Sequence, residues 1–311
     1  MWLRDLVFWW LTRPAQTRSL TVGGRQRTYL VHVPPKYGPN EPLPVVLALH
    51  AARMNGRIMA WISGLHQKAD EAGFLAVYPN GTGTKSAFTW NGGPCCGSAF
   101  QTGVDDVAFI RAVLDDLAQT FPVDARRVYA TGLSNGAIMA YRLASELSER
   151  IAAVAVVSGT MGTERCEPKR PVPLLHFHGM QDEFIPFAGG QGVRCLSGAN
   201  FYPVEHAIRA WIQANGCNEE PTTEELPDQA HDGTKVRKKT YGGGKDGAEV
   251  VLVVIEGGGH TWPGRPLPER SLGKPTANVS ANDLMWEFFM KHSMKEPTGD
   301  GPRASLAPRT I

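Results

Sequence analysis

Short, uninterrupted apolar runs alternate along this chain with segments of helical periodicity, and this alternation most constrains its fold. Residues 45–49, 74–78 and 250–255 are apolar throughout, as expected for strands that are buried on both faces. Apolar side chains recur every three or four residues across 105–121, which predicts an amphipathic helix. Buried strands that alternate with helices predict an α/β fold, with a doubly wound, mostly parallel sheet and helices on both faces.

The remaining predicted elements continue this alternation. Residues 19–22 and 27–33 flank Gly23 and Gly24, and they predict a hairpin that adds antiparallel strands at one edge of the sheet. Further strands are predicted at 127–131, 154–157 and 174–177, and further helices at 137–147, 204–215 and 282–291.

No proline-rich linker divides the chain, so we expect one domain over residues 19–294. Residues 1–18 precede it, and their apolar run at 6–11 is shorter than the roughly 7–15 residues of a signal peptide or the about 20 of a membrane-spanning helix. We expect a short amphipathic helix there, with an interfacial anchor or the remnant of a longer leader as alternatives. Residues 295–311 lack apolar periodicity and are predicted to be a loose tail.

The composition is typical of a globular protein with a sizeable core, because 42% of the residues are hydrophobic and 20% are charged. Lysine and arginine, 32 in all, nearly balance 30 acidic residues. The net charge of +2 gives no basic face for nucleic acid, so we expect neither a nucleic-acid partner nor stable membrane insertion. The sequence does not indicate an oligomeric state.

Residues 132–136 read Gly-Leu-Ser-Asn-Gly and match G-x-S-x-G between a predicted strand and a predicted helix. A sharp strand-to-helix turn brings backbone close on both sides of the serine, which explains Gly132 and Gly136. Such a turn presents the serine hydroxyl at the carboxyl end of the sheet, beside the positive end of a helix. Ser134 is therefore the candidate nucleophile of a hydrolase.

A serine hydroxyl needs a base to accept its proton, and in this architecture the chain order is serine, acid, histidine. His260 follows three glycines just after the strand predicted at 250–255, a flexible loop at a strand's carboxyl end. Asp182 follows the strand predicted at 174–177, and its carboxylate would hold the imidazole in the productive tautomer. Glu183 is the alternative acid.

A tetrahedral intermediate also needs hydrogen-bond donors for its oxyanion. The backbone N–H of Asn135, the residue after the nucleophile, is one candidate. A second donor is expected from the loop after residues 45–49, where Ala51 and Ala52 are both candidates. His50 is expected to organise this loop rather than to catalyse.

Motifs spread over most of the chain support the same site: TWNGGPCCG, YATGLSNGAIMAYRLA, HFHGMQDEFIPF and EGGGHTWPG. From about residue 19 to about residue 290 the chain resembles the α/β-hydrolase family of polyhydroxybutyrate depolymerases and feruloyl esterases, which is grouped with carbohydrate esterase family one and the LpqC-like esterases. The family's nucleophile, acid and base fall on Ser134, Asp182 and His260.

The resemblance implies a serine carboxylic-ester hydrolase that acts through an acyl-enzyme, with no cofactor and no metal. It implies that the partner is a small-molecule or oligomeric ester substrate. Feruloyl, cinnamoyl, other aryl and short-chain esters are the preferred candidates. Polyhydroxybutyrate oligomers and acetylated xylan are the alternatives. It also implies an extracytoplasmic or secreted enzyme, with a cytoplasmic one as the alternative.

Two further expectations come from the family pattern. Relatives carry glycines after the histidine of the oxyanion loop, whereas this chain carries Ala51, Ala52 and Arg53, which predicts a narrower pocket. The resemblance also places Trp262 and Trp90 near the cleft, where they would shape the acyl pocket.

Five cysteines leave at least one unpaired within a single chain: Cys95, Cys96, Cys166, Cys195 and Cys217. Adjacent cysteines rarely bond to each other, so bonds from Cys95 and Cys96 to two of the other three are one expectation. Free thiols are the other.

Two other classes of protein compete with the serine esterase. His176 and His178, with Asp182 after them, form an H-x-H pattern that a metal hydrolase would use, although the spacing fits no standard ligand set. A non-catalytic binding protein with the same fold is the second alternative, and the presence of all three triad residues disfavours it.

Overall fold

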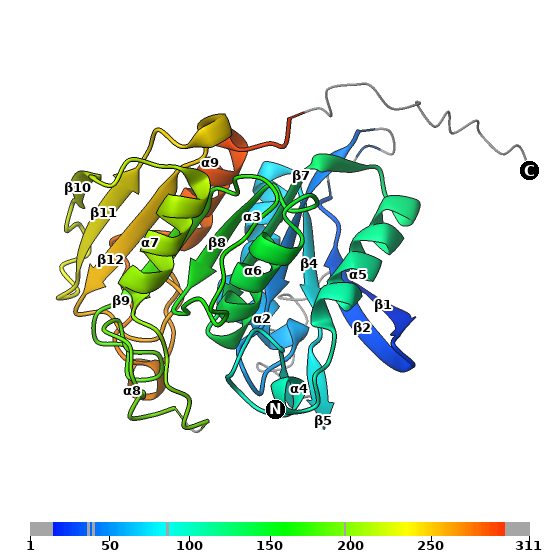
Figure 1. Cartoon of the computed structure of the whole chain (residues 1–311), viewed down its shortest axis with the longest axis horizontal. Coiled ribbons are helices and arrows are strands. Elements are labelled where there is room, and N and C mark those ends of the chain that lie inside the picture. The colour runs from blue at the N-terminus through cyan, green and yellow to red at the C-terminus, as the bar shows by residue number, and fades with distance from the viewer. Residues whose placement is uncertain (1–14, 36–37, 39–40, 85–86, 196, 296–311) are drawn as a thin grey trace, which may run out of the picture.

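The computed structural model describes residues 15–35, 38, 41–84, 87–195 and 197–295 (Figure 1). The segments predicted as an N-terminal helix, before residue 15, and as a loose tail, after residue 295, lie outside the described residues. The main sheet contains β1 (Ala15–Val22), β2 (Arg25–His32), β3 (Leu43–Leu49), β4 (Leu75–Pro79), β7 (Val123–Leu133), β8 (Ala153–Val157), β9 (Leu174–Gly179), β10 (Thr222–Leu226), β11 (Lys235–Tyr241) and β12 (Val250–Glu256).

The order of strands across this sheet is β1-β2-β4-β3-β7-β8-β9-β12-β11-β10. The central strands, from β4 across to β12, run parallel, and an antiparallel pair closes each edge. The central strands β3, β4, β8 and β9 are buried along their whole length. This burial explains the continuous apolar runs at residues 45–49, 75–78 and 153–157, whereas β9 also buries His176 and His178. The carboxyl ends of these parallel strands meet at one edge of the sheet, where the loops of a catalytic site are expected.

Helices cover both faces of the sheet (Figure 1). The longer helices are α2 (Gly56–Ser63), α3 (Leu65–Ala72), α5 (Asp106–Thr120), α6 (Asn135–Glu146), α7 (Val204–Asn215) and α9 (Ala281–Lys291). One core cluster joins α5, α6 and α7 to the sheet, and a second joins α2, α3 and α9 to the opposite face. The doubly wound α/β fold predicted from the sequence is therefore confirmed.

Short elements complete the described chain: β5 (Thr82–Thr84) and β6 (Ala87–Thr89), which pair with each other, and α4 (Ser98–Gln101), η1 (Lys245–Gly247) and α8 (Glu269–Leu272). Among the described residues, no helix combines the length and the apolar character needed to cross a bilayer.

The predicted elements are confirmed within a few residues at each end, including the hairpin of β1 and β2. The sheet begins at Ala15, four residues before the domain boundary expected at residue 19. Sequence periodicity missed α2 and α3, two eight-residue helices separated by a left-handed glycine, Gly64. It also missed β10, which is mostly exposed, and β11, which is mostly half-buried, because both carry polar and charged residues in place of a continuous apolar run.

Candidate active site

Ser134 occupies the sharp turn between β7 and α6, at the carboxyl end of the central parallel strands. Its backbone has φ 58° and ψ −121°, a conformation that L-residues rarely adopt and that the surrounding packing must hold. A side chain at Gly136 would collide with the carbonyl oxygen of Leu49, and one at Gly132 would collide with the Gly136 backbone. The two glycines therefore let β3, β7 and α6 approach closely enough to fix the serine in this turn.

Asp182 and His260 come from loops that follow the neighbouring parallel strands β9 and β12. The imidazole Nδ1 lies 2.7 Å from Oδ2 of Asp182, while Oδ1 accepts the backbone N–H groups of Phe184 and Ile185 at 2.8 and 2.9 Å. Burial acts to raise the pKa of the Asp182 carboxyl, but His260 and the Ile185 N–H outweigh burial and lower this pKa below its ordinary value. The carboxylate is thus ionised and directed at the imidazole.

Close packing, rather than flexibility, fixes the loop that carries His260. The His260 N–H donates to the carbonyl oxygen of Leu272 at 2.6 Å, and the Gly259 N–H donates to that of Lys274 at 2.9 Å. A Cβ at Gly259 would come within 2.5 Å of the Gly273 Cα. Glycine is therefore required at position 259 because the segment of residues 272–274 packs directly against it. The expectation that this loop is flexible is wrong.

Ser134 and His260 line one cleft with a volume of about 510 Å³. Phe184 and Ile185 form another part of its wall, and the ring centroids of Phe184 and His260 lie 4.8 Å apart. In the described part of the chain no hydrogen bond joins the Ser134 hydroxyl to His260, and such bonds commonly tighten only when substrate binds. The sequence analysis missed Phe184 and Ile185 as cleft residues; their position directly after the candidate acid was the available signal.

Ala51 and Ala52 also line the cleft, just beyond the end of β3. The Arg53 N–H is already used, because it donates to the carbonyl oxygen of Phe88 at 2.7 Å. No hydrogen bond among the described residues uses the N–H of Ala51 or Ala52, and the Asn135 N–H, first in α6, has no acceptor within its helix. All three predicted oxyanion donors thus remain candidates, and alanine in place of glycine removes none of them.

A buried hydrogen-bond network supports the oxyanion loop from behind. His50 Nδ1 donates to the Ala51 carbonyl oxygen at 2.8 Å, and its Nε2 accepts the Gly81 N–H at 2.9 Å. The Trp90 ring packs against this imidazole at a tilt of 35°, with 4.9 Å between ring centroids, and donates its Nε1–H to the His50 carbonyl oxygen. The Asn135 side chain bonds both the N–H and the carbonyl oxygen of Trp90, at 2.7 and 3.1 Å. His50 therefore organises the loop, as the sequence predicts.

Neither Trp90 nor Trp262 borders the cleft, because both side chains are fully buried. Trp262 packs in the core on the face that α9 covers, and its Nε1–H donates to Oδ1 of Asn282 at 2.9 Å. A buried indole needs both a large apolar surround and a partner for its N–H, and the core supplies both. The prediction that these two residues border the cleft and shape the acyl pocket is therefore wrong. Trp90 instead packs against His50 of the oxyanion loop, and Trp262 packs in the core beside the His260 loop.

His176 and His178 belong to a buried hydrogen-bonded chain rather than to a metal site. His178 Nε2 donates to the Ile185 carbonyl oxygen at 2.8 Å, so its Nδ1 accepts from His176 Nε2 at 3.0 Å. His176 Nδ1 then accepts the Tyr141 hydroxyl at 2.5 Å. Burial lowers the pKa of both imidazoles, so every ring nitrogen is used in the neutral form. Among the described residues no group of three or more potential ligands is close enough to hold a metal ion.

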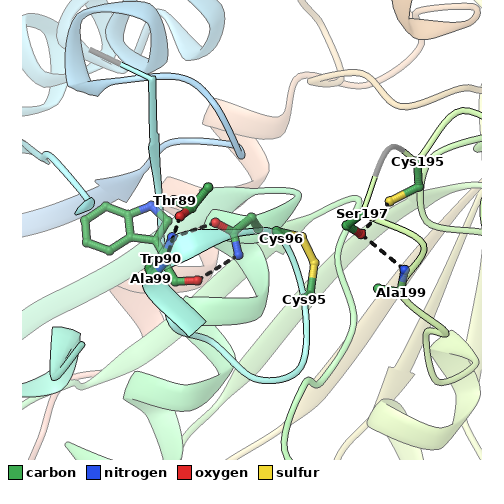
Figure 2. The surroundings of a disulfide bond; sticks show 9 residues. Thr89, Trp90, Cys95, Cys96, Ala99, Cys195, Ser197 and Ala199 are labelled. Carbon is green, nitrogen blue, oxygen red and sulfur yellow. Dashed lines mark hydrogen bonds between the residues drawn. A yellow bond between two sulfur atoms is a disulfide. The ribbon is translucent and has the colours of Figure 1, made fainter. Parts of the chain in front are cut away.

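Cys95 and Cys96 form a disulfide with each other beside the cleft, while Cys195 lies on a separate loop next to Ser197 (Figure 2). The expectation that the two adjacent cysteines bond to other cysteines is therefore wrong in this structure. Cys96 has a left-handed backbone, with φ 75°, within this tight turn. Cys166, Cys195 and Cys217 are free thiols, and burial raises the pKa of Cys166 to about 12.

Comparison with known proteins identifies the family. Residues 27–168 match the family described as Esterase PHB depolymerase. A protein named "Putative esterase NocK" from Nocardia uniformis subsp. tsuyamanensis is 32% identical over 286 residues, which cover 88% of this chain and 82% of that protein. Feruloyl esterase B from Piromyces equi is 30% identical over 75% of this chain, which spans 42% of that longer protein.

Solved structures agree on the fold. The acetyl xylan esterase from Aspergillus awamori superposes with a TM-score of 0.58 and 17% identity, over 88% of this chain and 99% of that one. The two proteins share the large, mostly parallel sheet and the helices that cover it. The chain therefore belongs to the Esterase PHB depolymerase family of α/β-hydrolases, and it is a carboxylic ester hydrolase.

Proposed function

We propose that this enzyme hydrolyses esters through a covalent acyl-enzyme on Ser134, with His260 as the base and Asp182 as its partner. The observation that carries the proposal is the 2.7 Å contact between His260 Nδ1 and the buried Asp182 carboxylate, beside a serine held in a strained turn at the same cleft. The histidine–carboxylate contact is the one that a serine hydrolase triad uses, and a serine in the same cleft supports its assignment as the nucleophile.

The tautomer follows from this contact. An ionised Asp182 accepts a hydrogen bond from Nδ1–H, which leaves Nε2 of His260 as the free base. Nε2 takes the proton of the Ser134 hydroxyl as its oxygen attacks the ester carbonyl carbon, and returns that proton to the leaving alcohol. Water then attacks the acyl-enzyme by the same route, which releases the acid and restores Ser134.

The developing oxyanion is assigned to backbone donors. The Asn135 N–H lies at the start of α6, where the helix dipole adds a partial positive charge. Ala51 or Ala52 supplies the second N–H from the loop after β3. Losing one such donor in a well-studied protease lowers kcat by about 10²–10³-fold, so the pair is a large part of the proposed catalysis.

Aryl and short-chain esters, including feruloyl and cinnamoyl esters, are the proposed substrates. The support is a relative named feruloyl esterase, together with a cleft whose wall includes the Phe184 ring and the apolar Ile185 side chain. Hydroxybutyrate oligomers and acetylated xylan are the alternatives. The proposed catalytic unit extends from the start of β1 at Ala15, rather than from residue 19, to residue 294. Its likeness to relatives named feruloyl esterase and acetylxylan esterase/xylanase supports a place of action outside the cytoplasm.

A substrate panel tests this proposal. Methyl ferulate, p-nitrophenyl acetate, acetylated xylan and hydroxybutyrate oligomers would be compared for the wild type, Ser134→Ala and Ser19→Ala. Ser19 is an exposed residue of β1, far along the sheet from the site, and is a matched control. We expect hydrolysis of the aryl esters by the wild type and the control alone. Absence of hydrolysis of any ester by the wild type would favour a non-catalytic binding protein.

A further inference from the structure

Two arginines and no acidic residue line the described wall of the cleft. Arg53 and Arg194 both line the cleft, and among the described residues that line it none is an aspartate or a glutamate. Ester hydrolysis itself needs no cation at this place, because the proposed oxyanion donors are backbone N–H groups. The two arginines therefore point to a property of the substrate rather than of the reaction.

The two guanidinium groups differ in their surroundings. Arg194 Nη1 lies 3.5 Å from Oε2 of Glu183, and its guanidinium lies 5.2 Å from the centre of the Phe184 ring. The exposed side chain of Arg53 has no hydrogen bond or ion pair with any described residue. Arg53 is thus the uncompensated charge of the cleft, and Arg194 is a weaker second one.

The backbone at Arg53 makes an arginine there unexpected. Its φ is 61°, in the left-handed region where glycine is favoured and a long side chain is strained. The Arg53 N–H is held by the Phe88 carbonyl oxygen, so the loop keeps this conformation with the side chain in place. Arg53 also follows Ala51 and Ala52 directly in the chain, and all three residues line the cleft that holds the proposed oxyanion donors.

We propose that Arg53 makes this esterase selective for esters that carry a carboxylate near the scissile bond, such as hemiesters of dicarboxylic acids or oligoesters with a free terminal acid. This inference rests on the function proposed above. A guanidinium binds a carboxylate through two parallel N–H donors, with a geometry that an ammonium or an amide does not reproduce. The carboxylate belongs either to the acyl group or to the alcohol.

Two pairs of esters distinguish these sources. For the acyl side, p-nitrophenyl hydrogen adipate is compared with its methyl ester; for the alcohol side, p-acetoxybenzoate is compared with its methyl ester. Each kcat/KM is divided by the rate constant for alkaline hydrolysis of the same ester, which removes differences in intrinsic reactivity. The measured quantity is the ratio of the anionic to the neutral member of each pair.

We expect a ratio of about ten or more in at least one pair at low salt, falling at least threefold in 1 M NaCl, where the Debye length is only about 3 Å. Arg53→Gln should reduce this ratio to about two or less, while Arg53→Lys retains part of it. Arg57→Gln, at an exposed position of α2 outside the cleft, is the matched control and should leave the ratio unchanged.

A ratio near one in both pairs for the wild type, or an unchanged ratio in Arg53→Gln, would overturn the inference. If Arg53→Gln does not fold, Arg53→Gly takes its place, because glycine suits the left-handed backbone at this position, and the same loss of the ratio is expected. Failure of the proposed function has a different signature, because the neutral esters would then show no hydrolysis that depends on Ser134.

Discussion

The cleft has an inner framework and an outer rim, and the two are built by different means. The inner framework consists of Ser134, Asp182 and His260 with the supporting pair His50 and Trp90. Apart from Ser134, which is half-buried, these side chains are buried, and hydrogen bonds or close backbone contacts fix them. The outer rim consists of Arg53 and Arg194, whose side chains are exposed on loops.

This difference separates two properties of the enzyme. Tight backbone packing and buried hydrogen bonds hold the framework in a single arrangement. Substitutions in the framework should therefore change the rate of hydrolysis of every ester by a similar factor. The rim side chains touch few neighbours, so changes there should alter the relative rates of different esters. The predictions below test this separation.

The largest expected effect is that of Ser134→Ala. Removing the nucleophile should lower kcat by about 10⁶-fold on every ester, with the fold intact, because triad residues act as a unit. Steady-state kinetics with p-nitrophenyl acetate, together with the circular dichroism spectrum, check this prediction. More than about a tenth of wild-type activity in this variant would remove Ser134 from the mechanism.

A second change tests which acid supports His260. Asp182→Asn should lower kcat by about 10⁴-fold, because an amide favours the wrong imidazole tautomer. Glu183→Gln is the matched control: this carboxylate is exposed and pairs with Arg194, so we expect less than a tenfold loss. A larger loss in Glu183→Gln than in Asp182→Asn would assign the acid to Glu183.

Buried His50 makes the framework sensitive to acid. Burial lowers the pKa of His50 from 6.5 to about 4 in the folded protein. The unfolded chain therefore binds a proton below pH 6.5 that the folded chain does not, and stability is lost as the pH falls from 6.5 toward 4. This single group should account for roughly 3 kcal/mol over that interval.

Urea unfolding at several pH values between 7 and 4 measures this loss. His50→Gln should be less stable at pH 7, because it loses the bond from Gly81 or the bond to Ala51, and its stability should depend less on pH. A free energy of unfolding that stays constant over this range in the wild type would contradict the assignment of His50 as a neutral framework residue.

The smallest expected effect is on selectivity in Trp262→Ala. A buried residue behind the His260 loop should change the rates on methyl ferulate and on a short acetyl ester by the same factor, within about twofold. Thermal unfolding should show a separate loss of stability of about 3–5 kcal/mol. If the rate on methyl ferulate fell tenfold more than the rate on the acetyl ester, Trp262 would have to be assigned to the acyl pocket. The proposed separation of framework and rim would then be weakened.

Much of the framework could be predicted from the sequence because local geometry dictates its residues. Gly132 and Gly136 are required by backbone contacts that any residue with a Cβ would break, so the turn around Ser134 leaves a clear pattern. The parallel strands place the residues after β9 and β12 at one edge, which made Asp182 and His260 predictable from chain order.

Side-chain direction and loop contacts were not predictable in the same way. Trp262 lies two residues from His260, yet its ring packs in the core, where Asn282 of α9 accepts its N–H. Phe184 and Arg194 reach the cleft through the fold of their loop, which has no periodic pattern. β10 and β11 escaped prediction because the edge strand β10 and its neighbour β11 carry charged residues instead of a continuous apolar run.

Covalent labelling with a fluorophosphonate, followed by peptide mapping, tests the central claim most directly. An activated serine reacts with this probe, and an ordinary serine hydroxyl does not. We predict one probe per chain, on Ser134 within the tryptic peptide of residues 128–142, with labelling greatly slowed in Asp182→Asn and absent in Ser134→Ala. Labelling of a different residue, or no labelling of a preparation that hydrolyses esters, would contradict the account.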